Sequence, residues 1–241
     1  MSKPPEAFYH SSVCALLDRL HDESSNQEAS IDASARKQVR EALKVNLDEG
    51  IRLQDNLMRD KFIAFDKDKS LFVYNLILSS GATNIVEIGT SFGVSTIYLA
   101  LAALENVQGK AGGNVRAKVI GTEKEESKAA IARKYWAEAG KEVEGVIDLR
   151  VGDLLQTLRT DIEEVHFILL DIWPYVALPA LELLLPKMRD GAIVVTDNTI
   201  SSAEGYSDLL KALRDEKGPF QSVTLPYSGG LEFSVYKPRT G

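Results

Sequence analysis

The most informative segment of this 241-residue chain is Val86-Glu-Ile-Gly-Thr-Ser-Phe-Gly-Val-Ser-Thr96. An apolar run enters the stretch, a glycine-bearing turn follows, and a helical pattern begins at Val94. Gly89 and Gly93 allow the backbone to turn tightly and to approach a ligand without a Cβ clash. In open α/β sheets, ligands bind beyond the carboxyl ends of the strands, where this turn lies. The stretch therefore predicts a strand, turn and helix that bind a ligand.

Short apolar runs alternate with helical patterns from Asn84 onward. The runs cover residues 85–88, 119–121, 147–151, 165–170 and 192–196. Such runs are typical of a parallel sheet that is covered on both faces. Two later runs, 221–225 and 231–236, flank the turn Tyr227-Ser-Gly-Gly230 and predict an antiparallel hairpin. We expect an α/β, Rossmann-like, mostly parallel seven-stranded sheet with helices on both faces, a C-terminal antiparallel hairpin and extra N-terminal helices.

The N-terminal region has a different pattern. Residues 1–60 are predicted to form a helical extension, acting as a lid or as the face of a homodimer, and residues 61–241 form the ligand-binding domain. Apolar residues at helical spacing predict a helix over 7–21, and the polar stretch 22–30 predicts a loop. A longer helix, capped by Asp32 or Ser34, is expected to run to about Leu53.

Composition narrows the class of partner. The net charge of −7 argues against a nucleic-acid surface, which requires clustered positive charge. No segment approaches the ~20 apolar residues of a membrane span, and the first residues do not resemble a signal peptide. A single cysteine, Cys14, excludes an internal disulfide. We therefore expect a cytoplasmic protein that acts on a small molecule.

The glycine turn also indicates the kind of cofactor. A dinucleotide site prefers G-x-G-x-x-G, whereas this turn has E-x-G-x-x-x-G. The Glu87 carboxylate would repel a pyrophosphate but tolerates the amino group and sulfonium of S-adenosylmethionine. Glu123 follows the second strand, where it could accept ribose hydroxyls, and Asp153 follows the third, where it could accept from an adenine amino group. Acids after strands are also common helix caps, and the turn could be an ordinary glycine turn.

These motifs resemble those of the cation-dependent O-methyltransferases, the group of catechol O-methyltransferase and caffeoyl-CoA O-methyltransferase. The similarity runs from about Ile63 to the C-terminus. Besides the glycine turn it is carried by Thr122-Glu123, Gly152-Asp153, Phe167-Ile-Leu-Leu-Asp171, Gly191-Ala-Ile-Val-Val-Thr-Asp197-Asn198-Thr199, and Leu225-Pro226 to Gly229-Gly230.

The resemblance implies a cofactor site and a metal site. We expect S-adenosylmethionine to be bound by Ile63, Glu87, Gly89, Thr90, Ser91, Gly93, Ser95, Glu123, Gly152, Asp153, Asp171 and Trp173. Asp171, Asp197 and Asn198 match the positions that bind a divalent cation, and their oxygens suit Mg²⁺ or Mn²⁺. Such a cation would act as Lewis acid and template for two adjacent hydroxyls, with Asp171 as the catalytic residue. Alternatively, Asp171 only shapes the pocket and Asp197-Asn198 forms a turn.

Two positions depart from the family pattern. Relatives carry a lysine, implied to be the general base, three residues after the first metal aspartate, and Pro174 stands there in this chain. The acceptor proton must then be removed by the metal alone or by another residue, unless the substrate needs no base. The pair Ser70-Leu71 replaces a glycine-glutamine pair close to the cofactor. Trp173 could stack on an aromatic acceptor or belong to the core.

Several functions remain open from the residues alone. The leading hypothesis is a cation-dependent O-methyltransferase acting on a vicinal-diol phenol or a similar small molecule. The second is a metal-independent methyltransferase acting on a hydroxyl, an amine or a carboxylate. The third is a cofactor-binding protein that has lost methyl transfer. An NAD-dependent oxidoreductase is disfavoured by Glu87 and by the missing third glycine.

Overall fold

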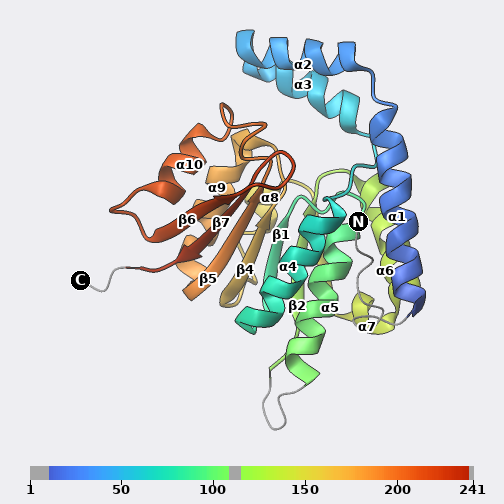
Figure 1. Ribbon diagram of the computed structural model, residues 1–241, viewed down its shortest axis with the longest axis vertical. Coiled ribbons are helices and arrows are strands. Elements are labelled where there is room, and N and C mark those ends of the chain that lie inside the picture. Colours follow the sequence, from blue (N-terminus) through green and yellow to red (C-terminus); the bar gives the residue numbers. More distant parts are fainter. Residues whose placement is uncertain (1–10, 109–114, 239–241) are drawn as a thin grey trace. The chain divides into compact units, whose positions relative to one another are not determined.

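The computed structural model of the chain describes residues 11–108 and 115–238 (Figure 1). Contacts divide the chain into two compact units, residues 1–64 and 65–241, and each is considered by itself. The sequence-based boundary after residue 60 lies shortly before this division. Over the two described ranges, no helix has the length and apolar character needed to cross a membrane.

The N-terminal unit contains α1 (Ser11–Ala29), α2 (Ala33–Val45) and α3 (Leu47–Met58). Helix α1 continues to Ala29, so the loop expected over residues 22–30 is wrong. The polar side chains of this segment bind backbone groups later in the unit. The Ser24 hydroxyl accepts a hydrogen bond from the Ala64 N–H at 2.7 Å, and the Gln27 side chain accepts from the Phe62 N–H. The polar face of a helix has the same composition as a loop, which explains the wrong prediction.

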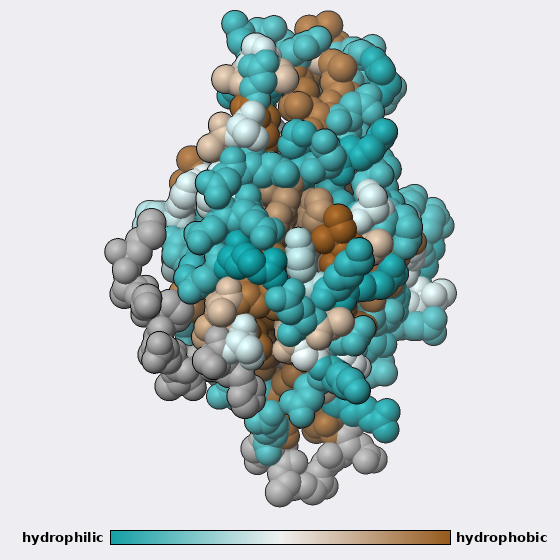
Figure 2. All heavy atoms as spheres, turned by 90° about the vertical axis from the view of Figure 1, so that its right-hand side faces the viewer, coloured by the Kyte–Doolittle hydropathy of each residue, from teal (hydrophilic) through white to brown (hydrophobic). Residues whose placement is uncertain are grey.

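Helices α2 and α3 replace the single long helix expected to end near Leu53. The chain breaks at Asn46, whose backbone is extended and whose side chain accepts from the Glu49 N–H at 3.2 Å. Asn46 therefore starts α3, and its own N–H caps α2 through the Ala42 carbonyl. Val45 and Leu47 beside the break are exposed, and apolar side chains are visible on the surface in Figure 2. The role of this unit as a lid or a dimer face stays a prediction.

The C-terminal unit is built on one seven-stranded sheet. Its strands are β1 (Asn84–Ile88), β2 (Lys118–Glu123), β3 (Ile147–Val151), β4 (Val165–Leu170), β5 (Met188–Asp197), β6 (Phe220–Leu225) and β7 (Leu231–Tyr236). The order is β3-β2-β1-β4-β5-β7-β6, and β1 to β5 are parallel. Strand β7 pairs antiparallel with both β5 and β6. The predicted fold class is confirmed.

Helices cover both faces of this sheet (Figure 1). One face carries α4 (Lys67–Ser80), α5 (Val94–Gln108) and α6 (Glu126–Ala139), which α7 (Lys141–Gly145) follows. The other carries α8 (Leu154–Thr157), α9 (Pro174–Leu184) with the short 3-10 turn Leu185–Lys187, and α10 (Ser207–Arg214). Val86 and Ile88 of β1 pack in the same core cluster as Leu181 of α9 and Leu213 of α10. All five residues of β1 are buried, including the polar Asn84 and Glu87, as in a central strand that is covered on both faces.

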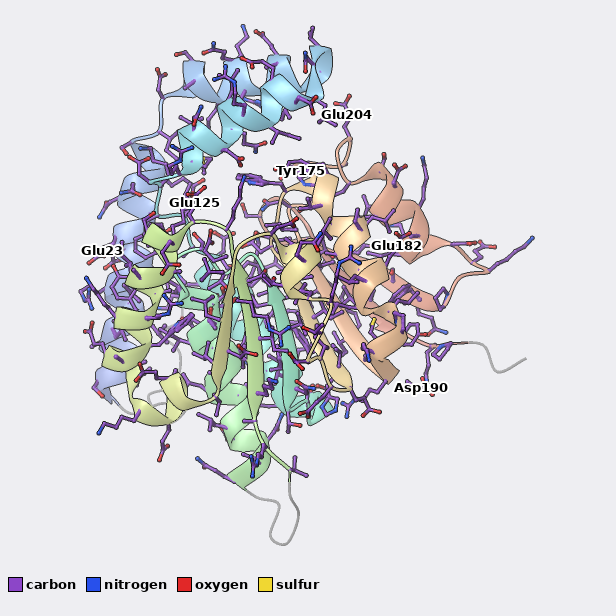
Figure 3. All side chains as sticks on the ribbon, turned by 180° about the vertical axis from the view of Figure 1, so that it is seen from behind. Glu23, Glu125, Tyr175, Glu182, Asp190 and Glu204 are labelled. Atoms are coloured by element: carbon purple, nitrogen blue, oxygen red, sulfur yellow. The ribbon has the colours of Figure 1, made fainter. Side chains whose placement is uncertain are left out.

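Strand register determines which residues meet at the carboxyl edge of the sheet. Ile88 pairs with Leu170, and Leu170 pairs with Thr196, so β1, β4 and β5 end side by side. The loops after β2 and β4 lie at this same edge. In Figure 3, Glu125 and Tyr175 mark it, and Asp190 lies at the opposite end. The order reverses between β1 and β4, which is where ligands bind in sheets of this kind.

A buried ion pair ties α10 to the terminal hairpin. The Arg214 guanidinium donates to both carboxylate oxygens of Glu232 at 2.7 Å, and the Glu232 side chain is 1% exposed.

We expect Arg214→Met to lower the free energy of unfolding by about 2 kcal/mol, below the ~3–5 kcal/mol of a fully buried pair, because Arg214 is half-exposed. Urea denaturation measures this. Lys211→Met, which removes an exposed pair with Asp208, is the control. Equal midpoints for the two variants would contradict the prediction.

Candidate functional site

The glycine turn between β1 and α5 is fixed on two sides. Gly89 has φ +100°, and a Cβ there would lie 2.0 Å from the carbonyl oxygen of Asp171. Gly93 has φ +76°, and a Cβ there would lie 2.5 Å from the indole nitrogen of Trp136. That nitrogen donates to the Gly93 carbonyl at 2.9 Å, a contact that sequence reasoning missed. Only glycine fits at these two positions, which explains their spacing.

Glu87 organises this turn from inside the sheet. The side chain is fully buried. Its carboxylate accepts hydrogen bonds from three hydroxyls, those of Thr90 at 2.8 Å, Ser95 at 2.6 Å and Thr96 at 2.6 Å. Burial raises the pKa of Glu87, and these hydroxyls oppose the rise. The contact of this carboxylate with the cofactor stays a prediction, and within the chain the carboxylate is bonded to the turn and to the start of α5.

Glu123 lies beside the turn at the end of β2. The Thr90 N–H donates to the Thr122 carbonyl at 2.9 Å, which joins the turn to this strand. The half-buried Glu123 carboxylate accepts from the Glu125 N–H at 2.8 Å. Burial raises its pKa, and hydrogen bonds from backbone groups, including that of Ser91, oppose the rise. Its partial exposure leaves it accessible to the hydroxyls of a ligand.

Gly152 and Asp153 follow β3, next to the end of β2. The Gly152 N–H donates to the Glu123 carbonyl at 2.9 Å. Asp153 is exposed and caps α8, because its side chain accepts from the Leu155 N–H at 2.9 Å. Asp153 is therefore a helix cap, which was one of the two alternatives for this residue. One cap bond leaves the other carboxylate oxygen of Asp153 open to a ligand.

Asp197 is the last residue of β5, and Asp171 directly follows the neighbouring strand β4, as the sequence predicts. Burial raises the pKa of Asp171 to about 8, the Asp197 carboxylate adds to the rise, and the Lys69 ammonium opposes it. Burial also raises the pKa of Asp197, again against the effect of Lys69. The two acidic side chains therefore share one electrostatic environment.

Lys69, on the first turn of α4, is the residue of this site that sequence reasoning missed. Its ammonium donates to Asp197 Oδ1 at 2.6 Å and lies 2.9 Å from Asp66 Oδ2, and the side chain is 2% exposed. Burial lowers the pKa of Lys69, but the two carboxylates outweigh that effect and raise it. The run Asp66-Lys-Asp-Lys69 is typical of a solvated surface. The three-residue spacing of Asp66 and Lys69 was the available signal.

Asn198 completes the contacts of Asp197. Its amide nitrogen donates to Asp197 Oδ2 at 3.1 Å, and its amide oxygen accepts from the Ser201 hydroxyl at 3.3 Å. A Cβ at Gly229, in the turn between β6 and β7, would lie 2.5 Å from that amide oxygen. Asn198 has φ +59° and forms a turn, which was the alternative to metal binding.

The contacts of Asp197 and Asn198 indicate whether these residues can bind a divalent cation. Mg²⁺ needs oxygen lone pairs at about 2.0–2.1 Å in octahedral geometry. Both oxygens of Asp197 already accept from nitrogen donors, Lys69 and Asn198, and the amide oxygen of Asn198 contacts another turn. Over the described ranges, no group of three or more His, Cys, Asp or Glu side chains could hold a metal. The predicted Mg²⁺ or Mn²⁺ is not confirmed, and the donor set does not fit it.

The segment after Asp171 explains the departure from the family pattern. Pro174 is the first residue of α9, a position where proline is favoured, and it packs against Gly205. Trp173 precedes it and is half-buried. This burial is compatible both with a pocket wall and with a place in the core. Ile63 belongs to the N-terminal unit, so its contact with the cofactor stays a prediction.

The close approach at Gly89 gives a stability prediction. We expect Gly89→Ala to lower the free energy of unfolding by about 3 kcal/mol or more, because backbone strain of ~1–3 kcal/mol adds to a backbone clash. Gly81→Ala is the control, since Gly81 also has positive φ but a Cβ there meets nothing within 4 Å. That variant should cost only about 1–2 kcal/mol. Thermal unfolding compares the two, and equal losses would rule out the contact with Asp171.

Comparisons with known proteins agree with this geometry. Residues 86–199 match a family model described as a methyltransferase domain. No curated protein sequence matches the chain.

Three solved structures share the fold. An O-methyltransferase from Bacillus cereus, in complex with S-adenosylhomocysteine, is 21% identical with a TM-score of 0.62, over 90% of this chain and 100% of that one. The O-methyltransferase TomG from Streptomyces achromogenes, in complex with S-adenosylmethionine, is 20% identical with a TM-score of 0.62, over 92% and 99%. A methyltransferase from Podospora anserina, bound to S-adenosylhomocysteine, is 15% identical with a TM-score of 0.60, over 99% and 100%. Residues 86–199 of this chain are therefore similar to a methyltransferase domain, and the chain shares the fold of these three methyltransferase structures.

Proposed function

We propose that this chain transfers a methyl group from S-adenosylmethionine to a hydroxyl of a small, aromatic acceptor. The observation that carries the proposal is the alignment of Glu123, Gly89 and Asp171 at the ends of three neighbouring strands. The similar proteins from Bacillus cereus and Streptomyces achromogenes are O-methyltransferases with a bound cofactor or its product, which supports the hydroxyl as acceptor.

The cofactor matches the charge and shape of this edge. Its amino group and sulfonium are positive, and the surrounding side chains include the carboxylates of Glu123, Asp153 and Asp171. Glu123 is the acceptor for the ribose hydroxyls, as carboxylates after the second strand are in related sheets. Gly89 and Gly93 let the backbone approach the ligand closely.

Methyl transfer at this edge is an in-line displacement. The bond between the methyl carbon and sulfur breaks, a bond between that carbon and the acceptor oxygen forms, S-adenosylhomocysteine leaves, and the hydroxyl proton passes to the Asp171 carboxylate. Asp171 lies at the end of β4 beside the glycine turn, where its carboxylate can accept a hydrogen bond from that hydroxyl. The half-exposed Trp173 next to it suits stacking on an aromatic acceptor. The divalent cation expected from the family resemblance has no part in this proposal, because the donor set does not fit it.

Calorimetric titration with S-adenosylhomocysteine tests the cofactor. We expect Glu123→Gln to weaken binding at least about 10-fold, because hydrogen bonds to a charged group contribute ~1.5–3 kcal/mol. Asp190→Asn, an acid at the opposite end of the sheet, should leave the affinity unchanged (Figure 3). Absence of binding to the wild-type protein would refute the cofactor proposal, and unchanged binding by Glu123→Gln would refute only the ribose assignment.

Transfer of labelled methyl groups tests the reaction. With a panel of phenols, amines and carboxylic acids, we expect phenols to be methylated. Asp171→Asn should lower kcat by about 100-fold or more, the range of acid–base groups, with a smaller change in the KM for the cofactor. Methylation of only amines or carboxylates would replace the hydroxyl assignment. Cofactor binding without transfer to any of the acceptors would favour a binding protein.

A further inference from the structure

The Lys69 ammonium occupies an unusual place for a positive charge. It lies in the first turn of α4, where the helix dipole opposes cations, and the side chain is 2% exposed. Two carboxylates compensate for this, Asp66 from the N-terminal end of the same helix and Asp197 from the end of β5. The lysine is therefore held at the carboxyl edge by charge rather than by local helix preference.

The carboxylates around Lys69 include the expected metal ligands. Asp197 accepts the ammonium directly at 2.6 Å, and Asp171 lies within electrostatic reach of the same ammonium. A divalent cation in such a site would neutralise these two side chains and fix their positions. The ammonium offsets part of this negative charge and fixes the position of Asp197 from within the chain.

We propose that the Lys69 ammonium takes the place of the divalent cation at this edge, so that the site keeps its carboxylates in position without binding Mg²⁺ or Mn²⁺. The catalytic consequence rests on the proposed methyl-transfer function, whereas the absence of metal binding does not. Lys69 is a positioning residue that acts through Asp197 and Asp171.

An ammonium in place of a divalent cation changes the class of acceptor that the site can bind. A divalent cation can chelate two adjacent hydroxyls, which is why a vicinal diol suits a metal-dependent enzyme. An ammonium has three N–H donors, and Asp197 and Asp66 engage two of them here. A site built in this way cannot chelate a diol. The acceptor is then a phenol recognised through one hydroxyl, and an adjacent second hydroxyl gives no advantage.

Titration with Mn²⁺, followed by electron paramagnetic resonance, tests the proposal without any turnover. With S-adenosylhomocysteine present, the wild-type protein and the control Lys211→Met should bind no stoichiometric Mn²⁺. Folded Lys69→Met, or Lys69→Gln where the first variant fails to bind the cofactor product, should gain one Mn²⁺ site. Adding Asp197→Asn to that variant should remove the site. A wild-type Mn²⁺ site that Asp197→Asn abolishes would overturn the proposal, and so would a folded Lys69 variant that gains no site.

Turnover supplies a second readout. Wild-type methylation should change by less than about two-fold when EDTA replaces Mg²⁺, and a phenol should be used as well as the corresponding catechol. Strong loss of turnover in EDTA would overturn the proposal. Failure of the wild-type protein to bind S-adenosylhomocysteine would refute the proposed function, and Mn²⁺ titration of the protein alone would still decide the role of Lys69.

Discussion

The contact between Gly89 and the carbonyl of Asp171 is the constraint on which the rest of the site depends. Strands β1 and β4 are parallel neighbours that end in register, so the turn after one lies against the end of the other. A side chain at residue 89 would push the two loops apart and would separate the glycine turn from Asp171. The hydroxyls that bind Glu87, and the bond from Thr90 to β2, fix the rest of the turn around this contact.

The carboxyl edge carries more negative charge than its one buried lysine offsets. Lys69 lies near the carboxyl groups of Asp66, Asp171 and Asp197. The nearby Glu87 carboxylate further raises the pKa of Asp171. Like charges in a dry site raise one another's pKa and favour a cationic ligand. A cofactor with a sulfonium and an amino group reduces this excess when it binds. The electrostatics of this edge and the charge of the proposed cofactor are therefore consistent.

Local sequence patterns predicted the sheet and the glycine turn but not the electrostatic contacts. Continuous apolar runs identified the parallel strands because both faces of this sheet are covered. The polar segment 22–30 and the break at Asn46 were missed, since a polar helix face and a loop have the same composition. Lys69 was missed for a different reason. Its partner Asp197 is 128 residues away, and only the folded strand order brings them together.

The chain has no lysine at residue 174, where the similar methyltransferases carry one according to the resemblance, but it has a buried lysine at residue 69. Pro174 begins α9 directly after the loop of Asp171, and the Tyr206 hydroxyl donates to the Ile172 carbonyl within that loop. These contacts restrain the loop, and residue 174 carries no basic side chain. The positive charge instead comes from α4 and contacts Asp197. Because a sulfonium is already a good leaving group, the methyl transfer that we propose depends mainly on placement of the acceptor oxygen, to which we expect this loop and the Lys69 charge to contribute.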